Sequence, residues 1–151
     1  EKADIIRKAV TVAHALGNES PKVAVCCAVE KVNPKMQCTV DAAELAEMNK
    51  RGEITGCIVE GPFALDNAIS PEAAAHKGVK GEVAGKADII MDPDIEAGNL
   101  LIKSMEYFAH AKKAGVILGA KTPIALTSRA STAESKLYTI AVARLAARMQ
   151  Q

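Results

Sequence analysis

The chain has 151 residues, of which 49% are hydrophobic and 25% charged, a composition typical of a folded domain and not of a disordered segment. Its 19 basic and 18 acidic side chains give a net charge of +1, so it lacks the basic surface expected of proteins that bind nucleic acid or anionic membranes. No apolar run reaches the length of a membrane span, and we expect neither a nucleic-acid nor a membrane partner.

Helices and strands are predicted to alternate in the first half of the chain. An apolar helical face followed by Gly17 predicts a first helix over 4–16, and a valine-rich run predicts a buried strand over 22–28. A second helix is expected over 40–50, started by Thr39, and a second strand over 56–60, closed by Gly61-Pro62. The face of the first helix comprises Ile5, Ala9, Val12, Ala13 and Leu16.

The same alternation continues to the C-terminus. A short helix is expected after Pro71, which suits a first helical position. The remaining predicted elements are a strand at 87–91, a helix at 95–112, strands at 116–118 and 123–127, and a last helix at 132–148. This order predicts an α/β fold with a mostly parallel sheet and helices on both of its faces.

The last helix is apolar around much of its circumference. One face carries Leu137, Ile140, Ala141 and Leu145, and a second carries Tyr138, Val142 and Met149. A helix of this kind needs two neighbours to cover it, so we expect it to expose an apolar face or to bury that face against another copy. Because the chain starts at Glu1 and not at methionine, it is expected to be processed or cut from something longer.

The four cysteines match no zinc or redox motif in their spacing. Cys26 and Cys27 lie inside an apolar run, where they are expected to point to opposite faces of a strand as reduced, buried thiols. The other two are Cys38 and Cys57. This usage favours the cytosol, and no set of metal ligands is apparent.

A turn at 127–131 joins the last predicted strand to the last helix, at the end of the sheet where α/β proteins bind ligands. Ser131 with Glu134 forms a capping-box pattern, in which we expect Glu134 to cap the helix; a role as catalytic acid–base is the less favoured alternative. The free N–H groups of the first turn and Arg129 predict an anion site. The alternative is a capped helix beside a solvated arginine.

Two more polar loops follow predicted strands. In 61–70, Asp66 and Asn67 either bind a polar ligand or make an Asx-type turn. In 93–99, Asp94 is expected to be an N-cap, and Gly98 suggests that a neighbouring group approaches the backbone closely. We expect the three loops to share one rim.

Five blocks of sequence, in this order and spacing, resemble the phosphate acyltransferases, the phosphate acetyltransferase and butyryltransferase family. They are 22–36, 60–70, 81–90, 93–105 and 123–136, and together they cover nearly the whole chain. The block GPFALDNAIS at 61–70 looks closer to the butyryl branch than to the acetyl branch.

The resemblance implies transfer of a butyryl or other short acyl group between coenzyme A and phosphate. It also implies two domains like those of isocitrate and isopropylmalate dehydrogenases, with the site in the cleft between them. Residues 1–151 would form a single domain, the C-terminal half, and the helix at 132–149 would pack on the missing N-terminal domain. Coenzyme A would be a substrate and not a permanently bound cofactor, and a homo-oligomer is expected.

The resemblance further implies catalytic roles for Ser128 and Arg129. The acetyl branch has an aspartate seven residues after that serine as the thiol base, where this chain has Ser135, so the base is left unassigned. The alternative is a non-catalytic acyl-CoA-sensing module; a dehydrogenase of related fold is disfavoured, because no carboxylate cluster is visible. Expected substrate-binding residues are Asp66, Asn67, Ser70, Asn99, Ser131, Thr132 and Ser135.

Overall fold

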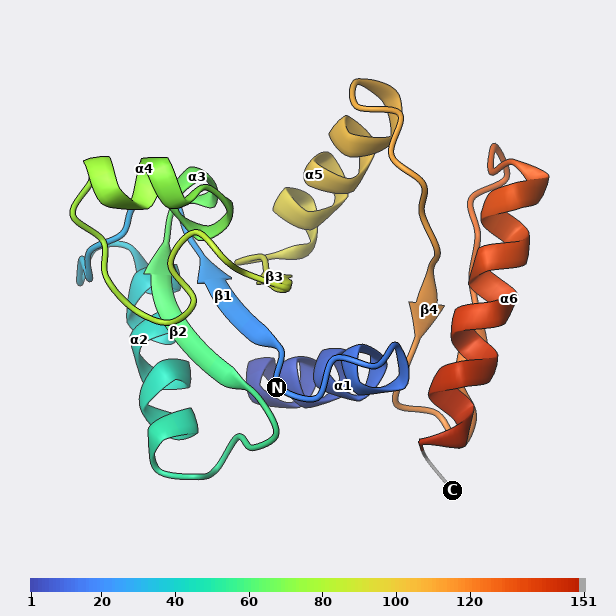
Figure 1. Ribbon diagram of the computed structural model, residues 1–151, viewed down its shortest axis with the longest axis horizontal. Helices are drawn as coiled ribbons and strands as arrows, with labels where there is room; N and C mark the ends of the chain where they lie inside the picture. Colours follow the sequence, from blue (N-terminus) through green and yellow to red (C-terminus); the bar gives the residue numbers. More distant parts are fainter. Residues whose placement is uncertain (150–151) are drawn as a thin grey trace.

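The computed structural model describes residues 1–149, which form six helices and five strands (Figure 1). In chain order they are α1 (Lys2–Ala15), β1 (Lys22–Cys26), α2 (Gln37–Lys50), β2 (Ile58–Phe63), α3 (Leu65–Ile69), α4 (Pro71–His76), β3 (Ile89–Met91), α5 (Ile95–Tyr107), β4 (Val116–Ile117), β5 (Ile124–Ala125) and α6 (Ala133–Arg148).

The main sheet has three parallel strands in the order β2-β1-β3, with Val23 of β1 paired to Val59 on one side and to Ile89 on the other. This confirms the predicted α/β class and the parallel sheet. The strands predicted at 116–118 and 123–127 do not join that sheet. They form a separate antiparallel pair, β4-β5, because a connection as short as 118–123 permits a hairpin, whereas a parallel pair needs a crossover of about a dozen residues or more.

Each face of the main sheet has its own buried cluster, so helices on both faces are confirmed. Residues of α1 and α2, including Ile6 and Leu45, cover one face together with Val25 and Cys27. On the other face Cys26 packs with residues of α3 and of the segment before β3. The two adjacent cysteines therefore point to opposite faces, as predicted. All four cysteines are free thiols, with Cys26 and Cys27 buried.

Strand β2 continues through Gly61-Pro62, which was expected to end it. Proline lacks the N–H that a ladder needs, and sheets tolerate it on edge strands and at irregularities. Here β2 is an edge strand, and its register against β1 shifts between Ala24 and Cys26, beside the proline. The predicted start of the second helix at Thr39 is also wrong, because α2 begins at Gln37 with Met36 as its N-cap.

Helix α1 has two apolar sides, and the prediction identified only one of them. Ala3, Ile6 and Val10 are the buried residues that pack on the sheet. The predicted face, with Ile5 46% exposed, points elsewhere. Its residues Ile5, Ala9 and Val12 line a hollow of about 460 Å³ whose other walls come from β4, from residues beside it and from α6.

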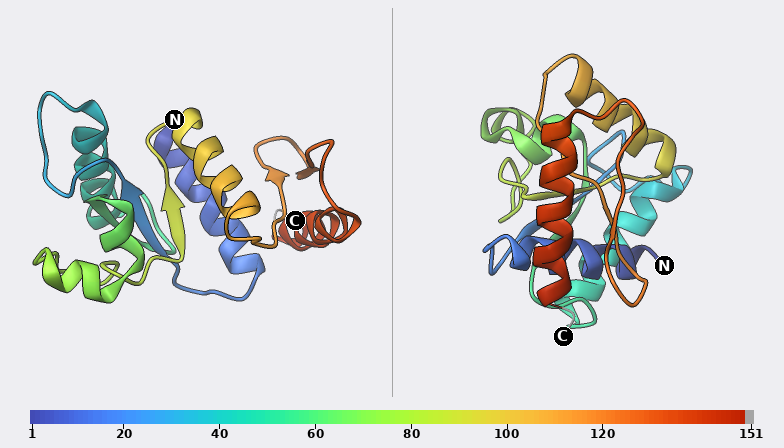
Figure 2. Two further views of the ribbon diagram at one scale, coloured as in Figure 1. Left: turned by 90° about the horizontal axis from the view of Figure 1, so that it is seen from above. Right: turned by 90° about the vertical axis from the view of Figure 1, so that its right-hand side faces the viewer.

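From β3 to Met149 the chain contributes no residue to either cluster after Met91. Figure 2 shows α6 set apart from the main sheet, with α1 and α5 between them. Helix α5 buries no residue, and it ends at Tyr107 and not at Lys112 as predicted, because the chain turns through His110, whose φ is 52°. On α6, Leu137 and Ile140 are more than 60% exposed, which confirms the predicted open apolar face.

Candidate functional site

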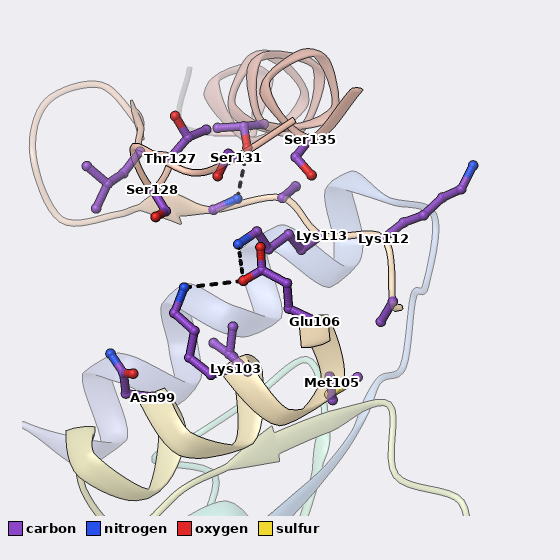
Figure 3. A pocket seen from close by; sticks show the side chains of 16 residues that line it. Asn99, Lys103, Met105, Glu106, Lys112, Lys113, Thr127, Ser128, Ser131 and Ser135 are labelled. Atoms are coloured by element: carbon purple, nitrogen blue, oxygen red, sulfur yellow. Dashed lines mark hydrogen bonds and ion pairs between the residues drawn. The ribbon is translucent and has the colours of Figure 1, made fainter. Parts of the chain in front are cut away.

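A cavity of about 680 Å³ opens between α5, the segment 111–115 and the stretch from Leu126 to Thr139 (Figure 3). Four of the predicted site residues line it: Asn99, Ser128, Ser131 and Ser135. The first comes from α5 and the other three from the start of α6 and the turn before it. The structure therefore brings together two of the three loops that were expected to share a rim.

The start of α6 is capped by Thr132 and not by Ser131 as predicted. The Thr132 side-chain oxygen accepts a hydrogen bond from the backbone N–H of Ser135 at 3.1 Å. Ser131 belongs to the preceding turn, where its N–H donates to the Ser128 carbonyl at 3.0 Å. Its own hydroxyl is thereby left for the cavity: Ser131 is 8% exposed, and its Oγ has no hydrogen-bond partner within residues 1–149.

Glu134 does not complete a capping box, which is a second correction. Its carboxylate accepts hydrogen bonds from Lys112 at 2.8 Å and from the Tyr138 hydroxyl at 2.6 Å. The Lys112 bond, followed by that of Tyr138, lowers the pKa of Glu134. Glu134 thus ties the segment after α5 to α6, and it lies outside the set of residues that line the cavity.

The predicted catalytic pair is divided between the cavity and its surroundings. Ser128 lines the cavity and is exposed to solvent, and its Oγ accepts a long, 3.4 Å hydrogen bond from the Ala130 N–H. Arg129 is exposed beside the cavity, in no ion pair or hydrogen bond with the described part of the chain. Its guanidinium is therefore available to a ligand, although the structure does not direct it into the hollow.

Two lysines and a glutamate, none of them predicted from the sequence, form the opposite wall. Lys103 donates to Glu106 Oε2 at 3.2 Å, and Lys113 bonds the same oxygen at shorter range. The hydrogen bond from Lys113, together with Lys103, lowers the pKa of Glu106. The i,i+3 spacing of Lys103 and Glu106 could have predicted their ion pair from the sequence. Lys113 joins them only because α5 ends at Tyr107.

Residues 61–70 lie elsewhere, so the single rim of three loops is wrong. Strands β2 and β3 are at opposite edges of the sheet, which separates the loops that follow them. Asp66 accepts from Lys77 at 2.9 Å, the main cause of its lowered pKa, and from the N–H of Asn67. Ser70 caps α4 through the N–H of Ala73. Asn67 is fully buried, and neither of its amide atoms has a partner among residues 1–149.

The loop at 93–99 behaves as predicted. Asp94 caps α5 by accepting from the N–H of Ala97 at 2.8 Å. A Cβ on Gly98 would lie 3.2 Å from Asp92 Oδ2, so a neighbouring group does approach the backbone closely there. Burial, and then the charge of Asp94, raises the pKa of Asp92.

Within residues 1–149, no cluster of three or more histidine, cysteine or acidic side chains is arranged to hold a metal ion. None of the helices of that part is long and apolar enough to cross a membrane.

Comparison with known proteins identifies the family of the chain. The family model described as phosphate acetyl/butaryl transferase matches residues 1–144. A probable phosphate butyryltransferase of Bacillus subtilis is 63% identical over 143 residues, which are 95% of this chain and 48% of that protein. A phosphate acetyltransferase of Thermotoga maritima is 56% identical over 142 residues, 94% of this chain and 48% of that protein.

A solved structure agrees with these relatives. The crystal structure of a branched-chain phosphotransacylase from Enterococcus faecalis superposes with a TM-score of 0.85 at 40% identity, covering 97% of this chain and 52% of that one. The chain thus spans about half the length of the proteins it matches. Sequence and fold agree, and the chain belongs to the phosphate acetyl/butaryl transferase family.

Proposed function

We propose that this chain provides the C-terminal half of a phosphate acyltransferase, which transfers a short acyl group between coenzyme A and phosphate. The observation that carries the proposal is the cavity that sets Ser128, Ser131 and Ser135 opposite the lysines of α5 and the segment after it. Hydroxyl and ammonium donors on facing walls suit a ligand rich in anionic oxygens. The relatives carry the names of butyryl- and acetyltransferases at 63% and 56% identity, so acyl chain length is left open.

In the proposed reaction the thiolate of coenzyme A attacks the carbonyl carbon of an acyl phosphate. A sulfur–carbon bond forms, and the carbonyl electrons move to oxygen. Collapse of this tetrahedral intermediate breaks the carbon–oxygen bond, and phosphate leaves with the bonding electrons. We assign Ser128 Oγ and the Arg129 guanidinium to the developing oxyanion, because donors aimed at that charge contribute most to such a reaction.

Ser135 is assigned to substrate binding and not to proton abstraction. A serine hydroxyl is too weak a base for a thiol with a pKa of about 8.5. Its Oγ lies 3.2 Å from the Thr132 hydroxyl, which keeps both side chains at the first turn of α6. Thr132 and Ser131 complete the proposed anion site there, while Asn99 lines the α5 side. Asp66, Asn67 and Ser70 stay assigned to coenzyme A, at a site separate from the cavity.

The proposed enzyme has a second domain that closes the cavity. Exposed apolar side chains on α5 and α6, such as Leu100 at 70% and Leu137 at 64%, support a covering partner, and the matched relatives are about twice as long. We propose an arrangement of two domains like that of isocitrate and isopropylmalate dehydrogenases, in which α6 packs against the other domain. We also propose that the enzyme forms homo-oligomers. Coenzyme A acts as a substrate, and the free cysteines favour the cytosol.

Reconstitution tests this proposal. We expect the chain alone to release little coenzyme A from butyryl-CoA and phosphate, and a fusion to the first half of the Bacillus subtilis relative to do so readily. Ser128→Ala in the fusion should slow turnover about 100-fold or more, as expected for loss of an oxyanion donor. Rapid turnover by the chain alone would contradict the need for a second half.

A second candidate is the non-catalytic acyl-CoA-sensing module, favoured by Ser135 standing where the resemblance expects an aspartate. The two functions separate in the same fusion protein. Binding of butyryl-CoA without any phosphate-dependent release of coenzyme A would establish the sensor, whereas turnover that depends on Ser128 would exclude it.

A further inference from the structure

We propose that Lys103 and Lys113, which share the carboxylate of Glu106, form a phosphate-binding wall of the cavity, facing the turn that carries Ser128. This inference rests on the proposed function for the identity of the ligand. The ligand chemistry is a phosphate group, whether free, in an acyl phosphate or within coenzyme A.

The charges on this wall do not balance. Two ammonium groups meet a single carboxylate oxygen, Glu106 Oε2, so the three side chains carry one uncompensated positive charge. The side chains of Lys113 and Glu106 are only 23% and 18% exposed, and that of Lys103 is 42% exposed. Because the wall is partly shielded from water, an anion entering the cavity gains more from this charge than it would at an open surface.

The facing wall supplies donors of a different kind. Ser131 Oγ is buried, has no partner within the described chain and belongs to a residue that lines the cavity. Close to it, α6 begins its 16 residues and presents the positive end of its dipole. In Figure 3 the Lys103 and Lys113 side chains point toward the side of the cavity that carries Ser128 and Ser131. An anion with oxygens on several sides can therefore bond both walls at once.

Lys112 plays a different part, although it also lines the cavity. Its side chain points outward in Figure 3 and pairs with Glu134 at 2.8 Å. The wall therefore consists of Lys103 and Lys113, and Glu106 competes with the ligand for their charge. Lys121, which is exposed and does not line the cavity, offers a matched control in the same third of the chain.

Calorimetric titration of the chain with inorganic phosphate, acetyl phosphate, coenzyme A and 3′-dephospho-coenzyme A tests the proposal. Lys103→Met and Lys113→Met should each weaken binding of at least one of these about tenfold, as expected for loss of a charged hydrogen bond that is partly screened. Lys121→Met should bind as the parent does. Glu106→Gln removes the competing carboxylate and should bind more tightly.

The ligands separate the sources of the phosphate. Weaker binding of inorganic phosphate and acetyl phosphate alone would assign the wall to the transferred group. Weaker binding of coenzyme A alone would assign it to that substrate's phosphates, with the dephospho form reporting on the 3′ group. Unchanged affinities in both lysine variants, or weaker binding by Glu106→Gln, would overturn the proposal. Binding of the expected pattern in a fusion protein that transfers no acyl group would instead reject the proposed function and leave the wall standing.

Discussion

Replacing Gly85 by alanine tests how the segment before β3 is fastened to the loop that follows β2. Gly85 has a φ of +71°, and its N–H donates to the Asn67 carbonyl at 2.8 Å. A Cβ there would lie 2.5 Å from both the N and the Cα of Pro71 and 2.9 Å from the Ser70 carbonyl carbon. All three are backbone atoms, so no side-chain rotation relieves the contact.

The expected loss of stability has two parts. A left-handed backbone costs an alanine about 1–2 kcal/mol. Forcing packed backbone apart costs about 1–3 kcal/mol more. The lower entropy of the unfolded alanine variant offsets about 0.4–1 kcal/mol. Gly85→Ala should therefore lose about 1–5 kcal/mol, which for a chain of this size corresponds to a fall in Tm of roughly 2–18 °C.

Gly78→Ala is the matched control. Gly78 has a similar φ of +65°, but a Cβ there would meet nothing within 4 Å. It should lose only the backbone part, about 1 kcal/mol. Urea unfolding followed by circular dichroism at 222 nm measures both variants, since the chain has no tryptophan. Equal losses for the two variants would show that the contact with Pro71 contributes nothing to the cost of the substitution.

Three further predictions concern protonation and capping. Burial raises the pKa of Asp92 above its ordinary value of 3.8, so the native state binds this proton more tightly than the unfolded state does, and the charged carboxylate lowers stability at pH values above the raised pKa. Asp92→Asn should therefore raise the Tm at pH 7, and this gain should shrink as the pH falls toward 3.8. A lower Tm for Asp92→Asn at pH 7 would contradict this. Burial also raises the pKa of Cys26 and of Cys27 to about 12, so a thiol reagent at pH 8 should modify them far more slowly in the native chain than in urea, as mass mapping would report. Thr132→Ala removes the N-cap of α6 and should cost that helix about 1 kcal/mol, with Ser131→Ala, one residue outside the cap, as the control in hydrogen exchange.

The main sheet and its helices were predictable because their signals are local and strong. The run of valines in β1 shows its burial in the residue pattern itself, and the helical periodicity of α1 predicted a helix there, although it indicated the wrong face as the one that packs on the sheet. The opposite directions of Cys26 and Cys27 followed from the period of a strand. Asp94 likewise predicted the start of α5, because an aspartate just before a helix commonly serves as its N-cap.

The site was predictable only in part, because its geometry depends on where elements end. The N-cap of α6 is Thr132 and not the predicted Ser131. Because of this difference of one residue, the Ser131 hydroxyl does not cap the helix, and its residue lines the cavity. The lysine wall depends on the end of α5 at Tyr107, and the residues 108–112 contain neither glycine nor proline to signal it. The separation of Asp66 from the cavity depends on strand order, which no single loop encodes.

Neither buried cluster extends beyond Met91, so the described chain falls into two parts that we expect to differ in their free energy of local opening. Amides of β1 and α2 should exchange with deuterated water only when the whole sheet unfolds, whereas those of α5 and α6 should exchange through smaller local openings. Ser128 and the lysines of the cavity lie in this second part of the chain, which opens locally at a lower free energy. A ligand that bridges the two walls of the cavity would therefore slow amide exchange in α5 and α6 and leave the exchange rates of the sheet unchanged. Binding would thus be detected as slower local opening of these two helices.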